Sequence, residues 1–197
     1  MCEILGNFLS IRGLELSPEK TLITHIDDGF DFLGWNFRKY KGTLLIKPSQ
    51  KSIKSITQKL KTTVSKAKVR TQDELIKTLN PVIRGWTNYH RHIVAKETFK
   101  KLDSYLWEIT WQWGKRRHPN KGRKWIARKY WHSEGNRNWV FRTKYNKLLK
   151  FSDAVIRRHA MPKLDANPYL DRNYFLERKD RIKKQTPWIQ TKLSFFV

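Results

Sequence analysis

The chain has 197 residues, a length that suits one ordinary domain or two small ones. Of these residues 39% are hydrophobic and 13% aromatic, which is enough to form a core and excludes disorder throughout. Its 42 Lys and Arg residues against 17 Asp and Glu give a formal net charge of +25, which favours nucleic acid as a partner over a membrane surface. No apolar stretch approaches the roughly 20 residues of a spanning helix, no secretory signal is visible, and the single cysteine, Cys2, excludes an internal disulfide or a Cys-based zinc site, so a reduced intracellular setting is expected.

The first 47 residues are expected to form a small α+β segment. A helix is indicated where apolar residues recur at spacings of three and four and a glycine follows. Strands are indicated where β-branched and aromatic residues run between turn residues. In chain order the predicted elements are a helix over residues 3–12 ended by Gly13, a strand over 21–26, a turn at 27–29, a second strand over 30–39 and a third over 43–47.

From Ser49 onward the apolar residues take helical spacing, with lysines at the other positions of an amphipathic helix. The cleanest apolar stripe runs from Phe99 to Trp113 and predicts that Trp113 lies in the core. A further helix lies between the one after Ser49 and the one that carries this stripe. Asn80-Pro81 is expected to break or restart it, because proline has no backbone N–H to donate. The predicted elements are helices over 49–67, 73–80, 81–92, from 96 to about 113 and 123–131, then a strand over 139–141.

Beyond residue 150 only small apolar clusters remain, and prolines interrupt them. The predicted fold class is therefore mainly α, with a small N-terminal α+β part that includes a β-hairpin, a helical bundle, and a basic, loop-rich tail.

Cationic and aromatic residues are interleaved over residues 79–131. No Asp or Glu falls between residues 109 and 133, and eleven Lys or Arg residues stand without an acid between residues 32 and 72. These cations either contact a phosphate backbone or form a solvated helix face. Trp125 and Trp131 lie amid Arg and Lys, so their rings either stack unpaired bases or pack beneath basic side chains. The sequence does not decide between phosphate contact and a solvated face for these cations, or between stacking and packing for these rings.

Catalytic and metal-binding patterns are scarce. Asp27-Asp28 is an adjacent carboxylate pair, but it follows a predicted strand and precedes Gly29, which is typical of a hairpin turn. His90 and His92, two residues apart on a predicted helix, point to different faces and make a poor metal pair. No Gly-rich phosphate-binding loop is present.

Several segments, in collinear order, resemble one known family. Residues 13–21 (Gly-Leu-Glu-Leu-Ser-Pro-Glu-Lys-Thr) and 29–35 (Gly-Phe-Asp-Phe-Leu-Gly-Trp) resemble the last palm segments of a group II intron reverse transcriptase. Lys47-Pro48-Ser49 and the helix after it resemble that family's thumb, and residues 79–92, continuing to Lys121, resemble its maturase-specific domain. The resemblance covers most of residues 3–142 and implies three regions: the end of the palm over 1–47, the thumb and maturase-specific domain over 48–133, and a basic DNA-binding-like region over 134–197.

The resemblance also indicates which family features to expect elsewhere. Family members carry a Tyr-Ala-Asp-Asp strand in the palm, whose aspartates bind two Mg²⁺ ions for polymerisation, and this chain is expected to begin after that strand. Residues 167–171 and 174–175 resemble the lead-in to the family's endonuclease region, without the Cys pairs of an HNH-type endonuclease. We therefore expect no catalytic residue and no cofactor in this chain, since Mg²⁺ would belong to the palm and to the intron RNA.

The remaining parts imply binding, with group II intron RNA as the main partner. Target DNA at the tail, an upstream palm polypeptide and a second copy of the chain are further expected partners; no membrane contact is expected, and the setting is the bacterial cytoplasm or an organellar matrix or stroma. Arg84 and Arg91 are expected to fork onto phosphates, while Trp86 or Tyr89 stacks on a base. The expected RNA contacts are Lys51, Lys54, Lys61, Arg84, Trp86, Tyr89, Arg91, Lys115, Arg116, Arg117, Lys121, Arg123, Lys124, Trp125 and Arg128, with Pro81 and Gly85 shaping the backbone.

Three hypotheses for function follow. The first is an RNA-binding maturase fragment that assists the folding and splicing of its intron. The second is the C-terminal piece of a split or frameshifted RNA-directed DNA polymerase, active only with an upstream palm polypeptide. The third is a degenerate remnant whose apolar face around residues 30–35 is exposed and prone to aggregation.

Overall fold

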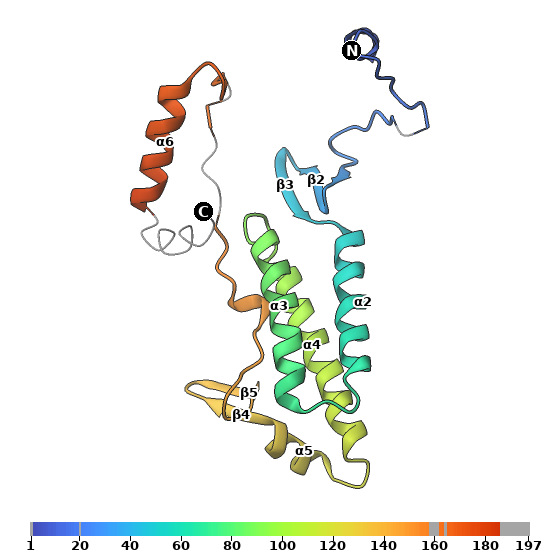
Figure 1. Cartoon of the computed structure of the whole chain (residues 1–197), viewed down its shortest axis with the longest axis vertical. Coiled ribbons are helices and arrows are strands. Elements are labelled where there is room, and N and C mark those ends of the chain that lie inside the picture. The colour runs from blue at the N-terminus through green and yellow to red at the C-terminus, as the bar shows by residue number, and fades with distance from the viewer. Residues whose placement is uncertain (1, 20, 158–161, 164, 186–197) are drawn as a thin grey trace. The chain divides into compact units, whose positions relative to one another are not determined.

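The computed structural model describes residues 2–19, 21–157, 162–163 and 165–185. The chain divides into two compact units, Met1–Arg158 and His159–Val197. The first unit contains a three-stranded sheet and a bundle of three long helices, and the second contains helix α6 (Arg172–Gln185). The described residues thus confirm a mainly α fold with a small β component (Figure 1).

The N-terminal part differs from the prediction in its strands. Helix α1 (Cys2–Ser10) is confirmed, but residues 21–25 are irregular and 26–28 form a turn, so the strand predicted over 21–26 is wrong. The strand predicted over 30–39 is in fact a hairpin that turns at Leu33-Gly34, where φ is +48° and +81°. The strands are β1 (Phe30–Phe32), β2 (Trp35–Tyr40) and β3 (Thr43–Pro48), paired antiparallel in that order.

Phe32 pairs with Trp35 directly across Leu33-Gly34, and such a two-residue loop requires a positive φ at both of its residues. A contact from outside the sheet also reaches this turn. Leucine rarely adopts a positive φ, and the Tyr89 hydroxyl donates a hydrogen bond of 2.5 Å to the Leu33 carbonyl oxygen. The residues 21–26 lack a strand for a different reason, because β-branched residues form a strand only where a partner continues the ladder. Here the Ile26 carbonyl accepts one bond, from the Lys39 N–H.

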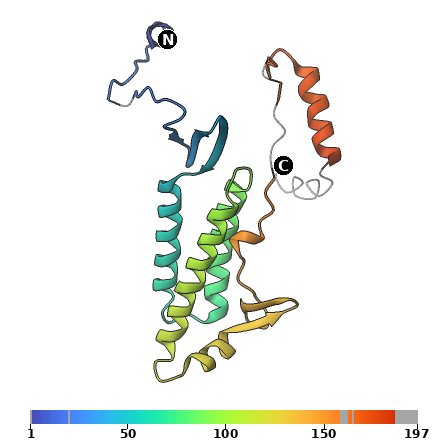
Figure 2. The ribbon, with the colours of Figure 1, turned by 180° about the vertical axis from the view of Figure 1, so that it is seen from behind.

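Three consecutive helices form the bundle, each antiparallel to the one before it: α2 (Gln50–Lys66), α3 (Gln72–His90) and α4 (Lys96–Arg117). Ser49 caps α2 by accepting from the Ser52 N–H at 3.1 Å, and Thr71 with Glu74 forms a capping box on α3. The predicted stripes are confirmed, because the following side chains are all buried: Ile56, Leu60, Val64, Phe99, Leu102, Leu106, Ile109 and Trp113. The sheet lies at one end of the bundle and α5 (Arg123–Tyr130) at the other (Figure 2).

Helix α3 continues through Pro81, so the predicted break at Asn80-Pro81 is wrong. Leu79 on one side of the proline and Ile83 on the other are both fully buried against the same core. Burial of such side chains contributes about 1.5–3 kcal/mol each, which offsets the roughly 3 kcal/mol cost of an internal proline. The proline itself lies on the exposed face of the helix.

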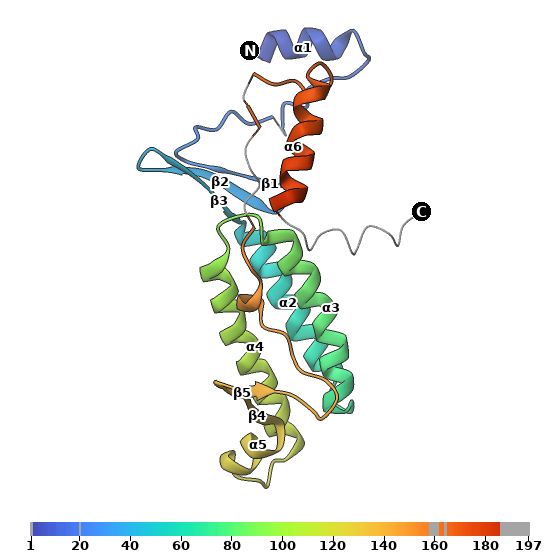
Figure 3. The same cartoon turned by 90° about the vertical axis from the view of Figure 1, so that its left-hand side faces the viewer.

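The chain after α5 returns to the bundle. Residues 131–141 form a hairpin of β4 (Trp131–Glu134) and β5 (Arg137–Phe141), of which β4 was not predicted. Residues 146–157, here called the return segment, then run back along α3 and α4 and include a short 3-10 helix, η1 (Phe151–Asp153) (Figure 3).

Side-chain hydrogen bonds fix the return segment in place. Asn80 donates to the Lys147 carbonyl oxygen at 2.9 Å and accepts from the Leu149 N–H at 2.9 Å. The Asp103 carboxylate accepts from two backbone N–H groups, those of Phe151 at 2.7 Å and Ser152 at 3.0 Å. Phe151 is fully buried, so this segment completes the core of the bundle.

The second unit is described by itself. Helix α6 was not predicted, because its apolar residues are few and show little periodicity. Just before this helix, the Asp171 carboxylate accepts from the Asn167 N–H at 2.7 Å. Across the described residues, no helix combines the length and apolarity that crossing a bilayer requires.

Candidate nucleic-acid interface

The bundle separates the predicted RNA-contact residues into groups near its two ends. Because α2 has 17 residues at about 1.5 Å each, the ends are about 25 Å apart, and salt screens exposed charges beyond about 8 Å at physiological ionic strength. The two groups therefore act as separate charged surfaces. Near the sheet lie Lys51, Trp86, Tyr89 and Arg91; near α5 lie Lys115, Arg116, Arg117, Lys121, Arg123, Lys124, Trp125 and Arg128.

The group near the sheet lines an open groove of about 790 Å³ between α2 and α3, here called the α2–α3 groove. Lys51 and Lys59 line it from α2, and Trp86, Tyr89 and His90 from α3. Lys59 was missed by the sequence analysis, although its spacing of eight residues from Lys51 places both on one helix face. The groove thus presents two ammonium groups beside aromatic rings.

The two predicted stacking residues of this groove differ in their availability. The Trp86 ring is half-buried and contacts the rings of His90 (4.1 Å between centroids), Phe99 (5.8 Å) and Phe151 (5.8 Å), so it packs into the core. Tyr89 is 47% exposed and leans on Trp35 at 5.3 Å. Tyr89 is therefore the ring of the pair that a base could reach.

His90 lies at the floor of the α2–α3 groove, almost fully buried, with Nε2 3.2 Å from the Ser52 hydroxyl. Burial lowers the pKa of His90 from 6.5 to about 4, because the charged imidazolium loses its hydration. The folded protein therefore keeps this imidazole neutral well below the pH at which the unfolded chain binds a proton.

This pKa predicts a loss of stability in acid. Between pH 6.5 and about 4 the unfolded state binds more protons than the folded state, so the free energy of unfolding should fall by up to about 3 kcal/mol as the pH drops through this window. Urea unfolding at several pH values measures the effect. His90→Gln should remove most of this slope, and an unchanged slope in that variant would assign the effect to other groups.

At the far end, exposed cations surround one exposed ring. The α5 cluster is defined here as Lys115, Arg116, Lys121, Arg123, Lys124, Trp125 and Arg128, all exposed. Trp125 is 39% exposed and has the ammonium groups of Lys121 and Lys129 at 5.6 and 4.9 Å from its ring centre. His118 meets the same ring edge-on at 4.8 Å, and burial together with Lys129, Arg117 and Lys121 lowers its pKa. The α5 cluster is thus strongly cationic, and Lys129 adds a further ammonium group beside it.

Two residues near this cluster, Arg117 and Trp131, make contacts that stabilise the fold. Arg117 donates to the carbonyl oxygens of Lys68 at 3.0 Å and Arg70 at 2.7 Å and lies 4.9 Å over the Trp113 ring, so it fixes the loop between α2 and α3. Trp131 is buried, 5.2 Å from Trp111, which decides between its two sequence interpretations in favour of packing.

The other predicted contacts lie along the bundle. Lys54 and Arg84 are exposed on α2 and α3. Lys61 lines a hollow of about 390 Å³ between α2 and α4 together with Arg116, which places these two predicted residues at one site. Arg91 caps α3 and is half-buried, and its Nε has no hydrogen-bond partner among the described residues. Within the same residues, no three His, Cys, Asp or Glu side chains gather closely enough to hold a metal ion.

Part of the chain matches the model of a known protein family. Residues 53–131 match the model of the group II intron maturase-specific domain, a segment that runs from the first turns of α2 to the first residue of β4. All the predicted RNA contacts except Lys51 lie inside it. The predicted resemblance to the C-terminal portion of a group II intron maturase is thereby confirmed.

Among curated proteins, the chain is similar to the "Maturase-like protein 1" of Euglena gracilis. The two are 31% identical over 97 residues, which cover 46% of this chain and 21% of that relative. The chain therefore spans about a fifth of the length of the curated relative that it matches.

Proposed function

We propose that this chain binds group II intron RNA and assists its folding and splicing. The observation that carries the proposal is the match of residues 53–131 to a maturase-specific domain, combined with the exposed cations of the α5 cluster in that same segment. A protein that binds the folded RNA and not its misfolded forms stabilises the folded RNA by mass action. The RNA supplies the splicing chemistry.

The two charged surfaces support a bridging role. Lysine and arginine contacts to phosphate contribute affinity that is independent of sequence, and the exposed rings of Tyr89 and Trp125 can stack on unpaired bases. Surfaces about 25 Å apart on one rigid bundle can engage two RNA segments at once, and each contact then raises the effective concentration of the other. Such a protein holds distant parts of an RNA at a fixed spacing.

A splicing assay tests this proposal. A group II intron precursor encoded near this gene is incubated at a Mg²⁺ concentration too low for efficient self-splicing, with and without the full chain. The chain should raise the spliced fraction of this precursor, and an unrelated structured RNA added as competitor should not abolish the effect. An unchanged spliced fraction at saturating protein would refute the proposal.

A second candidate function, part of an RNA-directed DNA polymerase, is favoured by exposed apolar side chains. Ile4, Phe8, Phe32 and Leu33 are all more than half exposed, as expected for a surface that another polypeptide covers. Primer extension with Mg²⁺ should be absent for the chain alone and restored by an upstream polypeptide that carries the palm. If primer extension stays undetectable while both pieces are soluble and associated, the result counts against this candidate. Aggregation of the isolated chain, without cooperative melting, would instead indicate a degenerate remnant.

A further inference from the structure

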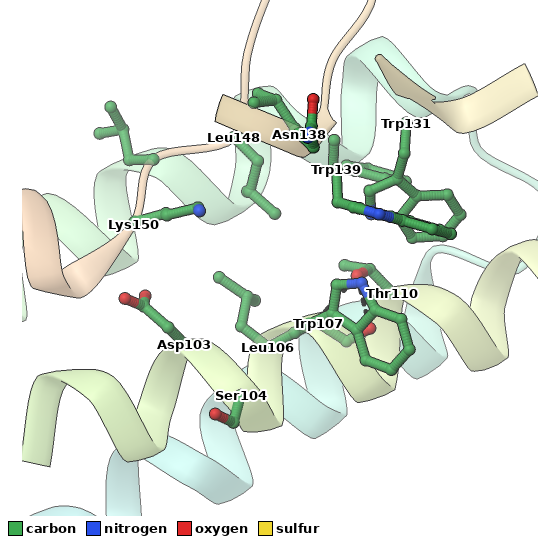
Figure 4. A pocket seen from close by; sticks show the side chains of 13 residues that line it. Asp103, Ser104, Leu106, Trp107, Thr110, Trp131, Asn138, Trp139, Leu148 and Lys150 are labelled. Atoms are coloured by element: carbon green, nitrogen blue, oxygen red, sulfur yellow. Dashed lines mark hydrogen bonds between the residues drawn. The ribbon is translucent and has the colours of Figure 1, made fainter. Parts of the chain in front are cut away.

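A pocket of about 350 Å³ lies between α4 and the β4–β5 hairpin, apart from the α2–α3 groove and the α5 cluster. Figure 4 shows Trp107 of α4 and Trp139 of β5 projecting into it from opposite sides, with Lys150 of the return segment reaching toward it. Buried Trp131 and Phe141, 5.1 Å apart, form part of its apolar lining. Its volume lies near the lower end of the roughly 300–1,000 Å³ of small-ligand sites, which suits one planar group.

Trp139 has an unusual backbone for its position. Its φ is +65°, in the left-handed region that glycine favours and that costs a bulky side chain conformational energy. The strand pairing is irregular between His132 and Glu134, directly opposite, and such irregularities re-aim side chains. Yet the Trp139 ring is 53% exposed, so the strained backbone secures little burial. What this conformation does achieve is an indole wall on one side of the pocket.

The polar groups of the pocket favour a ligand with hydrogen-bond acceptors. The Asp103 carboxylate already accepts from two backbone N–H groups, and the Thr110 hydroxyl donates to the Leu106 carbonyl oxygen at 2.9 Å. Among the described residues the Lys150 ammonium has no ion-pair or hydrogen-bond partner, and it can only donate. A planar ring carrying acceptors and an attached anion fits this arrangement.

We propose that this pocket receives one unpaired nucleobase of a bound single-stranded RNA segment. The base stacks on Trp107 and Trp139, and Lys150 donates to an acceptor of the same nucleotide. The +25 charge of the chain favours an anionic polymer over an apolar ligand, and unpaired bases are the parts of RNA that aromatic side chains recognise. The inference rests on the proposed RNA binding and adds a site outside the predicted contacts.

A comparison of two ligands tests the pocket. The full chain is titrated with a short single-stranded RNA and with a ribose-phosphate chain of the same length that lacks bases. Trp139→Gly removes the ring and suits the positive φ, so its melting temperature should be unchanged or raised. It should weaken RNA binding roughly 5- to 50-fold, which is about 1 to 2.4 kcal/mol, while the affinity for the baseless chain stays the same.

Matched variants identify the cause. Trp139→Phe should retain most of the affinity for RNA, because it keeps a ring. Lys150→Gln should also weaken RNA binding, whereas Tyr145→Ala, at a ring 81% exposed in the same region but outside the pocket lining, should not. A deoxyribose chain of the same sequence shows whether the sugar matters.

Four outcomes would overturn the inference. Equal losses for RNA and the baseless chain would show that Trp139→Gly acts on the fold or on phosphate contacts. If Trp139→Gly binds RNA as tightly as the wild type, while removal of charges from the α5 cluster weakens RNA binding, the pocket is rejected. The proposed function then still stands. A change in oligomeric state with RNA affinity intact would assign the ring to a protein contact. If the wild-type chain binds neither ligand, both proposals fail.

Discussion

Replacing Arg116, Arg123, Lys124 and Arg128 together by Gln is expected to weaken RNA binding at least tenfold at physiological salt. Each lost phosphate contact should also reduce the slope of log affinity against log salt by about 0.7 on single strands and 0.9 on duplex, so the slope should be shallower by about 3 in total. Glutamine keeps the helix propensity of α4 and α5. Arg117 is left in place, since its guanidinium bonds the loop between α2 and α3.

The control for this variant carries the same net charge. Lys39, Lys41, Lys100 and Lys144 are exposed and lie outside the α5 cluster, so their joint replacement by Gln removes four charges elsewhere. Fluorescence anisotropy of a labelled intron RNA over a salt series compares the two variants with the wild type. If both lose the same affinity and slope, RNA responds to the overall field of the chain and the α5 cluster is not a site.

Phe151→Ala is expected to destabilise the first unit by about 3–5 kcal/mol. Phe151 is fully buried, and its ring meets that of Trp86 edge-on at 5.8 Å, so truncation leaves a cavity at the centre of the bundle. In a unit of this size the melting temperature should fall by roughly 6 to 20 °C. Urea unfolding followed by tryptophan fluorescence measures the loss.

Val155→Ala provides the comparison, because Val155 lies on the same return segment but is 70% exposed. Its stability should change by no more than about 0.5 kcal/mol. A loss below about 1 kcal/mol for Phe151→Ala would mean that the return segment is not part of the core, contrary to the structure.

The helices were predictable because each one buries a single stripe. The residues Phe99 to Trp113 show this on α4, where periodicity identifies both the helix and its buried face. Pro81 was misjudged because a local rule about proline was weighed without the core contacts of Leu79 and Ile83. The hairpin turn at Leu33-Gly34 was missed because residues 30–39 were interpreted as one strand, although a glycine inside a strand pattern can mark a turn with positive φ.

The candidate site was predictable in composition but not in arrangement. The sequence identified the cations of residues 115–128, yet it did not show that the Arg117 guanidinium bonds the backbone of the loop between α2 and α3. Nor did it separate Trp86, which packs, from Tyr89, which is accessible. The pocket beside Trp139 was missed entirely, since it requires α4 and β5 to meet, and pairing between segments that far apart leaves no periodic signal.

The return segment has a consequence for synthesis on the ribosome. The three bundle helices are complete in sequence at Arg117, but the bonds from Asn80 and Asp103 join partners 48 to 69 residues further along. A nascent chain that has emerged only to residue 130 therefore exposes the apolar surface that Phe151 later covers. We expect this intermediate to be protease-sensitive and to depend on chaperones, or on early contact with RNA, until residue 157 has left the exit tunnel.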